Sequence, residues 1–375
     1  MLKSCRQTTL PIIYLTNQCD LNCSYCLIKK RKETRYFLEI KEYQARIRKL
    51  LEKNNHIKSI NMTGGEPTLH PELLKIVDIT RKVGIDHIII NTNGIMLAKD
   101  RELLQALHDR DVTLALSINS IPFNSVQERL FEKLNDLKMP VAIITIASHQ
   151  GEENLKKIYD YFIKSNIVVS LEIQPMVFTG ENVPAKNDYE KIKKEKITLD
   201  MIKEKIELIS NGKISTGSYF SPGNSHESCY QSNYLLKINE STFVPFMDFV
   251  DRKKFENLFK DNLFVITLDK AEQLFKDTLY ELWSKEDSKP KENILEIFKK
   301  LLEELFPREK IPGREQIKKL PEYVKSIGIH SYMDCFTFSE ERLRTCGRHI
   351  LLHQGKKVPV CYFNHVLNPT AGVTF

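Results

Sequence analysis

The stretch LPIIYLTNQCDLNCSYC, residues 10–26, places three cysteines directly after an apolar, β-branched run. Cys19, Cys23 and Cys26 supply three thiolates, whereas an iron–sulfur cube has four irons to ligate. In electron carriers another cysteine normally closes the fourth corner. The compact triplet therefore predicts a cluster with one open iron, which can bind and reduce another molecule.

Two other chemistries fit these cysteines less well. A Cys-x2-Cys pair in a cytosolic chain is more often half of a zinc site, but zinc sites usually combine two pairs and this sequence has only one. The 8 cysteines among 375 residues are too sparse for a disulfide scaffold. Zinc and a plain ferredoxin-like cluster stay open as alternatives.

Apolar, β-branched runs recur through the first half of the chain and predict strands. They are Leu10–Thr16, Ile57–Thr63, Asp86–Thr92, Val112–Ile118, Val141–Ala147 and Ile167–Gln174. Segments with helical spacing separate them, at Ile40–Leu51, Glu72–Val83, Lys99–Leu107, Val126–Leu137 and Glu153–Ile163. Strict alternation predicts a parallel sheet that curls into most of a β/α barrel, with its chemistry at the carboxyl ends of the strands. The alternation alone also fits a doubly wound sheet.

The sequence GGEP, residues 64–67, ends the second predicted strand. Its glycines permit close backbone approach, and its glutamate can accept hydrogen bonds from an ammonium group. Alone it is a turn and a weak signal. Beside a Cys-x3-Cys-x2-Cys triplet with Tyr25 before the last cysteine, it resembles the signature of the radical S-adenosylmethionine (SAM) enzymes.

The resemblance implies a 4Fe–4S cluster whose open iron binds SAM, and a 5'-deoxyadenosyl radical that abstracts hydrogen from an unactivated C–H bond. It also favours an α/β fold with a partial (β/α)6 TIM-like barrel. The residues that it implies for cofactor binding are Tyr25, Gly64, Gly65, Glu66, Pro67, Asn93, Ser117 and Gln174. Asparagine and serine also fill turns and helix caps commonly, so that role stays open for Asn93 and Ser117. No residue is assigned as catalytic.

Four further thiols lie in the second half of the chain, at Cys229, Cys335, Cys346 and Cys361. They suffice for one complete auxiliary 4Fe–4S cluster. Their wide spacing makes this a prediction about tertiary structure, and a free buried cysteine is also an ordinary core residue. Cys5 is left over and is assigned to neither site.

The alternating pattern ends near residue 180. We expect a radical SAM partial barrel over residues 1–180 and, over residues 181–375, an α-rich extension that binds the auxiliary cluster and covers the substrate. An apolar helical stripe that includes Ile294, Phe298 and Leu301 lies in this extension. The stripe fits a helix that covers a core, and contact with a membrane surface is the alternative.

A narrower resemblance extends beyond the predicted barrel. Its landmarks are the segments at residues 174–180, 197–200, 221–229, 332–334, 346–349 and 361–364. In that order they resemble the radical SAM group that contains tetraether lipid synthase and the enzymes that C-methylate a pterin precursor. The resemblance implies carbon–carbon bond formation, by coupling or alkylation, on a lipid-like or small organic substrate. Residues 222–224 depart from the pattern, because Pro-Gly-Asn stands where another cysteine is expected, which implies fewer metal centres.

Two other function classes stay open. A radical SAM peptide maturase also combines a barrel with auxiliary clusters, and an iron–sulfur sensor or scaffold would bind a cluster without turnover. Incubation with reductant and SAM separates the last class from the enzymes, because a scaffold releases no 5'-deoxyadenosine.

Charge and hydropathy restrict partners and location. The net charge of +7 is spread along helical patterns, without the concentrated basic face that nucleic-acid binding requires. A mildly basic surface suits an acidic flavodoxin or ferredoxin as electron donor, or peripheral contact with anionic membrane head groups. The sequence has no secretory signal and no apolar run of about 18 residues, which predicts a cytoplasmic enzyme.

Overall fold

The computed structural model describes residues 7–27, 35–148, 151–179, 183–222, 225–240, 242–259, 268–284, 291–307, 309, 316 and 319–364. Cys5 lies outside the described residues. Within them, no helix is long and apolar enough to cross a membrane.

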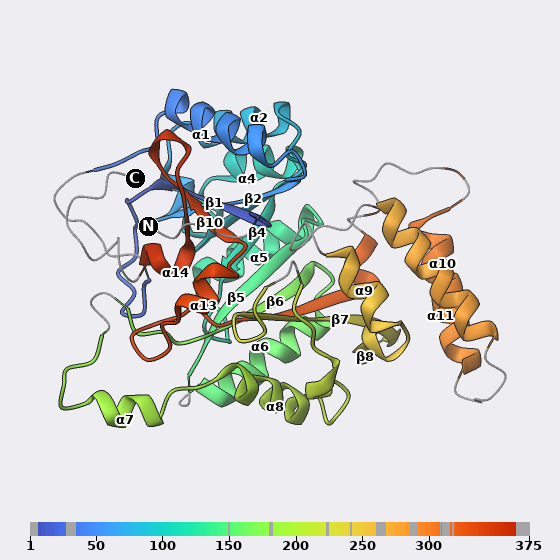
Figure 1. Cartoon of the computed structure of the whole chain (residues 1–375). Helices are drawn as coiled ribbons and strands as arrows, with labels where there is room; N and C mark the ends of the chain where they lie inside the picture. The colour runs from blue at the N-terminus through green and yellow to red at the C-terminus, as the bar shows by residue number, and fades with distance from the viewer. Residues whose placement is uncertain are drawn as a thin grey trace.

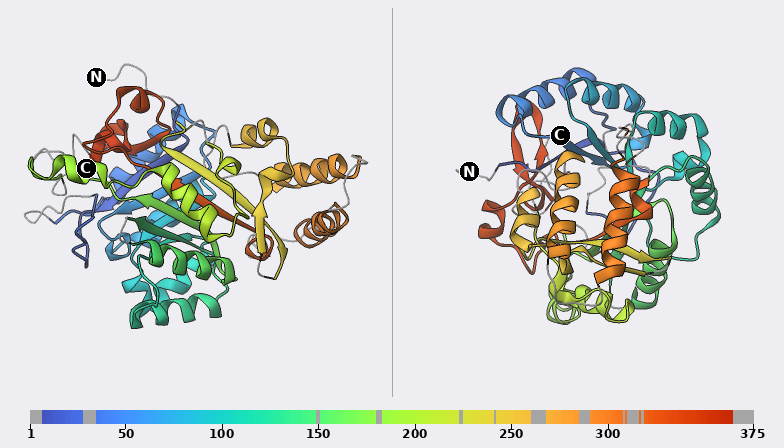
Figure 2. Two further views of the ribbon diagram at one scale, coloured as in Figure 1. Left: turned by 90° about the horizontal axis from the view of Figure 1, so that it is seen from below. Right: turned by 90° about the vertical axis from the view of Figure 1, so that its right-hand side faces the viewer.

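Six parallel strands form the first half of the sheet. They are β1 (Leu10–Thr16), β2 (Ser59–Gly64), β3 (His87–Thr92), β4 (Thr113–Ser117), β5 (Val141–Ala147) and β6 (Val168–Pro175). The connecting helices are α1 (Ile40–Lys53), α2 (Leu73–Lys82), α3 (Ile95–Lys99), α4 (Arg101–Asp109), α5 (Ser125–Asp136) and α6 (Glu152–Lys164). The helices of this half lie on the outside of the strands (Figures 1 and 2). The predicted partial (β/α)6 TIM-like arrangement is confirmed.

Local sequence explains where these helices begin. The Asn124 side chain accepts hydrogen bonds from the backbone N–H groups of Val126 and Gln127, and the Asn124 backbone N–H donates to Gln127 Oε1, which forms a capping box before α5. Asp100 caps α4 by accepting from the Leu103 backbone. The predicted helix Lys99–Leu107 corresponds to α4, and the short α3 that ends just before this cap was not predicted.

The second half of the chain extends the same sheet. Its strands are β7 (Tyr230–Asn239), β8 (Thr242–Pro245), β9 (Val324–His330), β10 (Arg348–Leu351) and β11 (Lys357–Pro359), and the strand order is β11-β10-β1-β2-β3-β4-β5-β6-β9-β7-β8. β10 pairs parallel to β1, and β9 pairs parallel to β6. A continuous sheet therefore crosses the predicted domain boundary at residue 180, and the two-domain division stays a prediction.

The two ends of the parallel sheet approach each other across its inner face. Arg348 of β10 lies near His330 of β9, with its Nη1 atom 2.7 Å from the imidazole Nδ1. Leu10 of β1 and Tyr230 of β7 form a small buried apolar cluster on the same side. These contacts join strands from opposite ends of the strand order, so the sheet curls toward closure.

The extension also carries most of the remaining helices. They are α7 (Tyr189–Lys194), α8 (Leu199–Ile209), α9 (Arg252–Leu258), α10 (Leu268–Ser284), α11 (Lys291–Leu305), α13 (Glu340–Arg344) and α14 (Val360–Tyr362). The pair α10 and α11 projects from one side of the molecule (Figure 1). Phe298 and Leu301 are fully buried in a second apolar core beneath these helices, which confirms that the predicted stripe covers a core.

A buried lysine joins the extension to the barrel. Lys325 of β9 is 2% exposed, and its Nζ donates to the backbone carbonyls of Phe162 and Ser165 at the end of α6. Cationic groups complement the orphan carbonyls at a helix carboxyl end. Burial, and secondarily the neighbouring Lys237, lowers the pKa of Lys325 to about 7.

This lowered pKa predicts a pH-dependent stability. Below about pH 7 the amine is protonated in both states, and between about 7 and 10.5 only the unfolded state keeps the proton. The free energy of unfolding of the wild type, minus that of Lys325→Met, should therefore increase with pH by up to about 1.4 kcal/mol per unit. Urea denaturation of both proteins at pH 7 and pH 9 measures the difference. A difference that does not change with pH would contradict the lowered pKa of Lys325.

Candidate functional site

The thiol triplet lies in a loop directly after β1. Cys19, Cys23 and Cys26 are all partly exposed free cysteines. The Leu21 backbone N–H donates to Cys19 Sγ at 3.4 Å, and the Cys26 N–H donates to the Cys23 carbonyl at 3.3 Å. In the described residues no three Cys, His, Asp or Glu side chains are close enough to hold a metal ion. The donor set itself, three thiols and nearby backbone amides on one loop, fits a 4Fe–4S cluster.

The loop at residues 64–66 holds the backbone that precedes the triplet. The Gly65 N–H donates to the Thr16 carbonyl at 2.7 Å, and the Glu66 N–H donates to the Gln18 carbonyl at 2.7 Å. A methyl group at Gly65 would collide with the Gln18 carbonyl, and Gly64 adopts a φ of +139°. Glycine is therefore required at both positions for this close approach.

Glu66 is the centre of a buried hydrogen-bond cluster. Its Oε1 accepts from the Thr68 backbone and hydroxyl and from the Thr92 hydroxyl, and its Oε2 accepts from the Asn93 backbone at 2.8 Å. Burial raises the pKa of Glu66, and these hydrogen bonds oppose that rise. The carboxylate thus ties the end of β2 to the end of β3, while Pro67 begins the short 3-10 helix η1 (Pro67–Leu69).

Asn93 connects this cluster to the thiol loop. Its Nδ2 donates to Asp20 Oδ1 at 2.7 Å, and Asp20 lies between the first two cysteines. Its own Oδ1 accepts from the Ile95 backbone at the start of α3. The sequence identified Asn93 but not Asp20 or Thr92, because the partner of each is set by the packing of neighbouring strand ends.

Tyr25 lies beside the thiols, and a residue that follows β4 is hydrogen-bonded to its hydroxyl. The Asn119 Nδ2 lies 2.9 Å from the Tyr25 hydroxyl, and Asn119 in turn accepts from the Ile146 backbone. Burial and then the adjacent Cys23 raise the pKa of Tyr25. Asn119 lies two residues beyond β4, and its link to Tyr25 depends on tertiary structure.

The remaining predicted pocket residues lie on the same edge of the sheet. Ser117 is exposed at the end of β4, and Gln174 is partly exposed near the end of β6. The predicted residues therefore gather at the carboxyl ends of the strands, where parallel β/α barrels place their chemistry. Direct contact of each with a cofactor stays a prediction.

Three of the four later thiols interact electrostatically near the other end of the strand order. Burial, with a smaller contribution from Cys229, raises the pKa of Cys346 to about 11. Burial is also the chief cause that raises the pKa of Cys361, and the charges of Cys346 and Cys229 raise it as well. The Met333 backbone N–H donates to Cys361 Sγ at 3.3 Å. Cys335 follows Met333 by two residues along the chain.

Cys335 itself has a different environment. Burial and then the adjacent Asp334 raise its pKa, and Lys196 opposes the rise. Asp334 is fully buried and pairs with Lys196 at 2.5 Å. Its Oδ2 also accepts from the Phe178 backbone, just beyond β6. Cys229, Cys346 and Cys361 thus influence one another electrostatically, whereas the Cys335 backbone is hydrogen-bonded to Phe178 in the segment that follows Gln174.

Arg342 is a site residue that the sequence did not reveal. Its Nε donates to Cys229 Sγ at 3.2 Å, and its Nη2 donates to the carbonyls of Ser228 and Ser331. A buried guanidinium group with fixed backbone partners can stabilise negative charge on the sulfur. No local motif marks this arginine.

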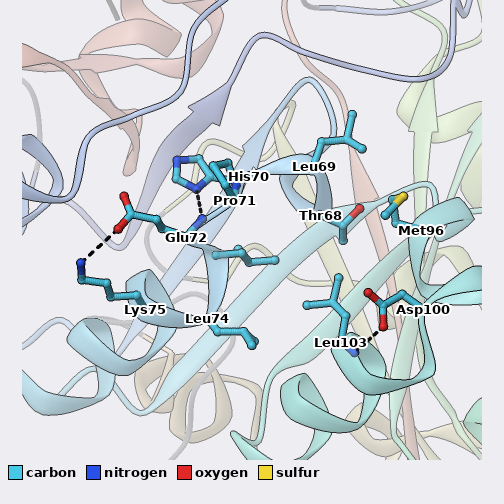
Figure 3. A pocket seen from close by; sticks show the side chains of 11 residues that line it. Thr68, Leu69, His70, Pro71, Glu72, Leu74, Lys75, Met96, Asp100 and Leu103 are labelled. Carbon is cyan, nitrogen blue, oxygen red and sulfur yellow. Dashed lines mark hydrogen bonds and ion pairs between the residues drawn. The ribbon is translucent and has the colours of Figure 1, made fainter.

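A separate pocket of about 560 Å³ lies near the Glu66 cluster (Figure 3). Thr68, His70, Met96 and Asp100 are among its lining residues. Thr68 contacts Glu66, but no cysteine and none of the predicted cofactor residues line this pocket. The chemistry of the strand ends therefore lies elsewhere.

Comparison with known proteins matches residues 13–183 to the radical SAM superfamily. These residues are similar to a radical SAM domain and extend from β1 through β6, the six parallel strands of the first half of the sheet. The family implies a 4Fe–4S cluster and SAM, in agreement with the thiol loop and the GGEP turn.

The relatives cover different shares of the chain. It is 21% identical to 7,8-dihydro-6-hydroxymethylpterin dimethyltransferase of Methanocaldococcus jannaschii, over 95% of this chain and 76% of that protein. It is 32% identical to GTP 3',8-cyclase of Chlorobaculum tepidum, over 31% of this chain and 36% of the cyclase. Among solved structures, SuiB of Streptococcus suis bound to the precursor peptide SuiA matches with a TM-score of 0.46 and 18% identity, covering 56% of this chain and 47% of SuiB.

The close backbone contact at Gly65 predicts a specific defect. In Gly65→Ala the added methyl must displace the Gln18 carbonyl, and with it the start of the thiol loop. We expect the variant to lose most of the iron bound by the triplet. The rate of SAM cleavage should decrease at least about tenfold, which corresponds to about 1.4 kcal/mol in activation free energy. Gly217→Ala is the matched control, because nothing lies near a methyl group there. Equal iron content in the two variants would refute this role of Gly65.

Proposed function

We propose that this chain is a radical SAM enzyme that cleaves SAM reductively and abstracts hydrogen from an unactivated C–H bond. When bound, the cluster would supply the electron that splits SAM into methionine and a 5'-deoxyadenosyl radical. Its main support is the contact between the GGEP turn and the chain that leads into Cys19, Cys23 and Cys26. Two backbone hydrogen bonds make this contact. The radical SAM domain supports the same chemistry.

The residues around this junction take distinct proposed roles. The Glu66 carboxylate already accepts hydrogen bonds from Thr68 in its own loop and from Thr92 and Asn93 at the end of β3. The backbone at residues 64–66, and not this carboxylate, would therefore face the methionine amino group. Pro67 would fix the turn. Tyr25 would lie against the adenine. Further proposed contacts to SAM are Asn93, Ser117 and Gln174.

The second thiol group would hold an auxiliary 4Fe–4S cluster. The electrostatic contact among Cys229, Cys346 and Cys361 supports this ligand set. Cys335 is the proposed fourth ligand, and it lies two residues from Met333, which donates to Cys361 Sγ. Arg342 would stabilise the Cys229 thiolate.

We propose carbon–carbon bond formation, by coupling or alkylation, as the outcome of the reaction. The resemblance to a protein named as a pterin dimethyltransferase, over 95% of this chain, supports alkyl transfer to a lipid-like or small organic substrate. A flavodoxin or ferredoxin would provide the electron. We also propose that residues 1–180 contribute the SAM site and that residues 181–375 cover the substrate.

Loss of one thiol from the triplet predicts a complete catalytic defect. Cys23→Ala should abolish 5'-deoxyadenosine formation, because a cluster with too few thiolates cannot present an iron to SAM. Chromatographic quantitation after anaerobic incubation with dithionite and SAM measures this loss. Activity equal to the wild type would eliminate the triplet as the cluster site.

A substitution in the second group predicts a different defect. Cys361→Ala should lose about half of the bound iron, as expected when one of two four-iron clusters is missing, and should keep some SAM cleavage. Iron analysis and 5'-deoxyadenosine formation are measured on the same preparation. Full iron content in this variant would rule out Cys361 as a ligand.

A further inference from the structure

A half-buried carboxylate on the inner face of the barrel has no part in the cysteine sites. Glu172 lies on β6, and the Tyr230 hydroxyl donates to both of its oxygens, at 3.1 and 3.2 Å. The Ser170 hydroxyl donates to Glu172 Oε1 at 3.1 Å. A methyl group at Gly328 would collide with this carboxylate and with the Tyr230 hydroxyl, so the glycine leaves room for both.

Charge is also organised around Glu172. The Arg348 guanidinium carbon lies 4.5 Å from the ring centroid of Tyr230, and Arg348 contacts the neutral His330, whose pKa burial and then Arg348 lower. Burial raises the pKa of Glu172, and Arg348 opposes that rise. The phenol from β7 thus holds the carboxylate by hydrogen bonding, and the guanidinium from β10 favours its charged form electrostatically.

Glu172 shares the inner face with the predicted SAM pocket. Strand register aligns Ile144 with both Ser117 and Glu172, and Gln174 is two residues farther along β6 on the same face. The Glu172 side chain keeps partial exposure. It therefore lies directly below the strand ends where SAM is proposed to bind.

The surrounding inner face is only partly apolar. Ile89, Ala115 and Ala142 form a small cluster there, separate from the core beneath the helices. On the neighbouring strands β2 and β3, the buried side-chain oxygens of Asn61 and Asn91 have no hydrogen-bond partner among the described residues. Buried polar groups usually find a partner, and one left without a protein partner calls for an explanation.

We propose that Glu172 anchors an N–H-donating group of the substrate on this inner face, with Tyr230 and Ser170 as positioning residues. This inference rests on the proposed function for the location of the substrate. An ionised carboxylate accepts about four hydrogen bonds, and Tyr230 and Ser170 make only three contacts to it among the described residues. The amide oxygens on β2 and β3 can accept further donors. The substrate class is a nitrogen-bearing small molecule, because an acyl chain has no donor for these groups.

A purely structural role for Glu172 makes a different prediction. In that case the carboxylate would serve only to join β6 to β7 through Tyr230, and small N–H donors would bind without regard to it. The test therefore measures ligand binding and protein integrity in the same variants.

Isothermal titration of the anaerobic, cluster-loaded full chain with benzamidine, in the presence of SAM, tests the anchor. Benzamidine presents parallel N–H donors, and neutral benzamide is its matched probe. We expect benzamidine to bind the wild type more tightly than benzamide, and Glu172→Gln to weaken benzamidine about 10- to 100-fold, as for a charge-assisted hydrogen bond. Glu153→Gln is the control, because that glutamate is exposed on α6.

Each outcome has a defined meaning. Unchanged benzamidine affinity in Glu172→Gln, or no benzamidine binding to the wild type while dodecanoate binds, would overturn the proposal. If Glu172→Gln does not fold, Tyr230→Phe takes its place. This substitution removes both phenol hydrogen bonds to Glu172 and keeps the ring beneath Arg348. We then expect several-fold weaker benzamidine binding, and unchanged binding would overturn the proposal. Benzamidine binding that depends on Glu172, in a protein that forms no 5'-deoxyadenosine, would contradict the proposed function alone.

Discussion

Two backbone hydrogen bonds between the residues that follow β1 and β2 determine where the chemistry of this molecule can occur. The N–H groups of Gly65 and Glu66 donate to the carbonyls of Thr16 and Gln18, so the GGEP turn lies against the chain that leads into the thiols. Parallel strands bring their carboxyl ends to one edge of the sheet, and this contact then brings two separate motifs together. The Glu66 carboxylate extends the arrangement to β3 through Thr92 and Asn93.

The second half of the chain does more than cover the barrel. Its strands β9 and β10 join opposite ends of the six-stranded parallel sheet, and Arg348 contacts His330 across the inner face. Cys229 precedes Tyr230 on one side of this contact, and Cys346 Sγ donates to the Arg348 carbonyl on the other. The second thiol group, the closure of the sheet and the inner carboxylate are consequently parts of one polar wall. A change in this wall would affect both the inner face and the thiols.

The sequence predicted the first half of the fold well because its signals are local. The bounds of β1 and β5 match the predicted strands, and the other four differ by one or two residues at an end. Strands β10 and β11 were not predicted, since they are very short and β10 pairs with β1 from the far end of the chain. The thiols were found because few chemistries use such a triplet. Glu172 was missed, although the alternation of Ser170, Glu172 and Gln174 on β6 was a readable sign of a polar inner face.

We propose that the triplet of Cys19, Cys23 and Cys26 holds a cluster with an open iron for SAM, and all of the proposed chemistry depends on it. Electron–nuclear double resonance of the reduced, anaerobically prepared protein, mixed with SAM labelled at its amino nitrogen and carboxylate oxygens, measures this most directly. We expect hyperfine coupling from both labels to the cluster, in the wild type and in Cys361→Ala alike. A colourless, zinc-filled protein, or a reduced cluster that shows no coupling to either label, would contradict it.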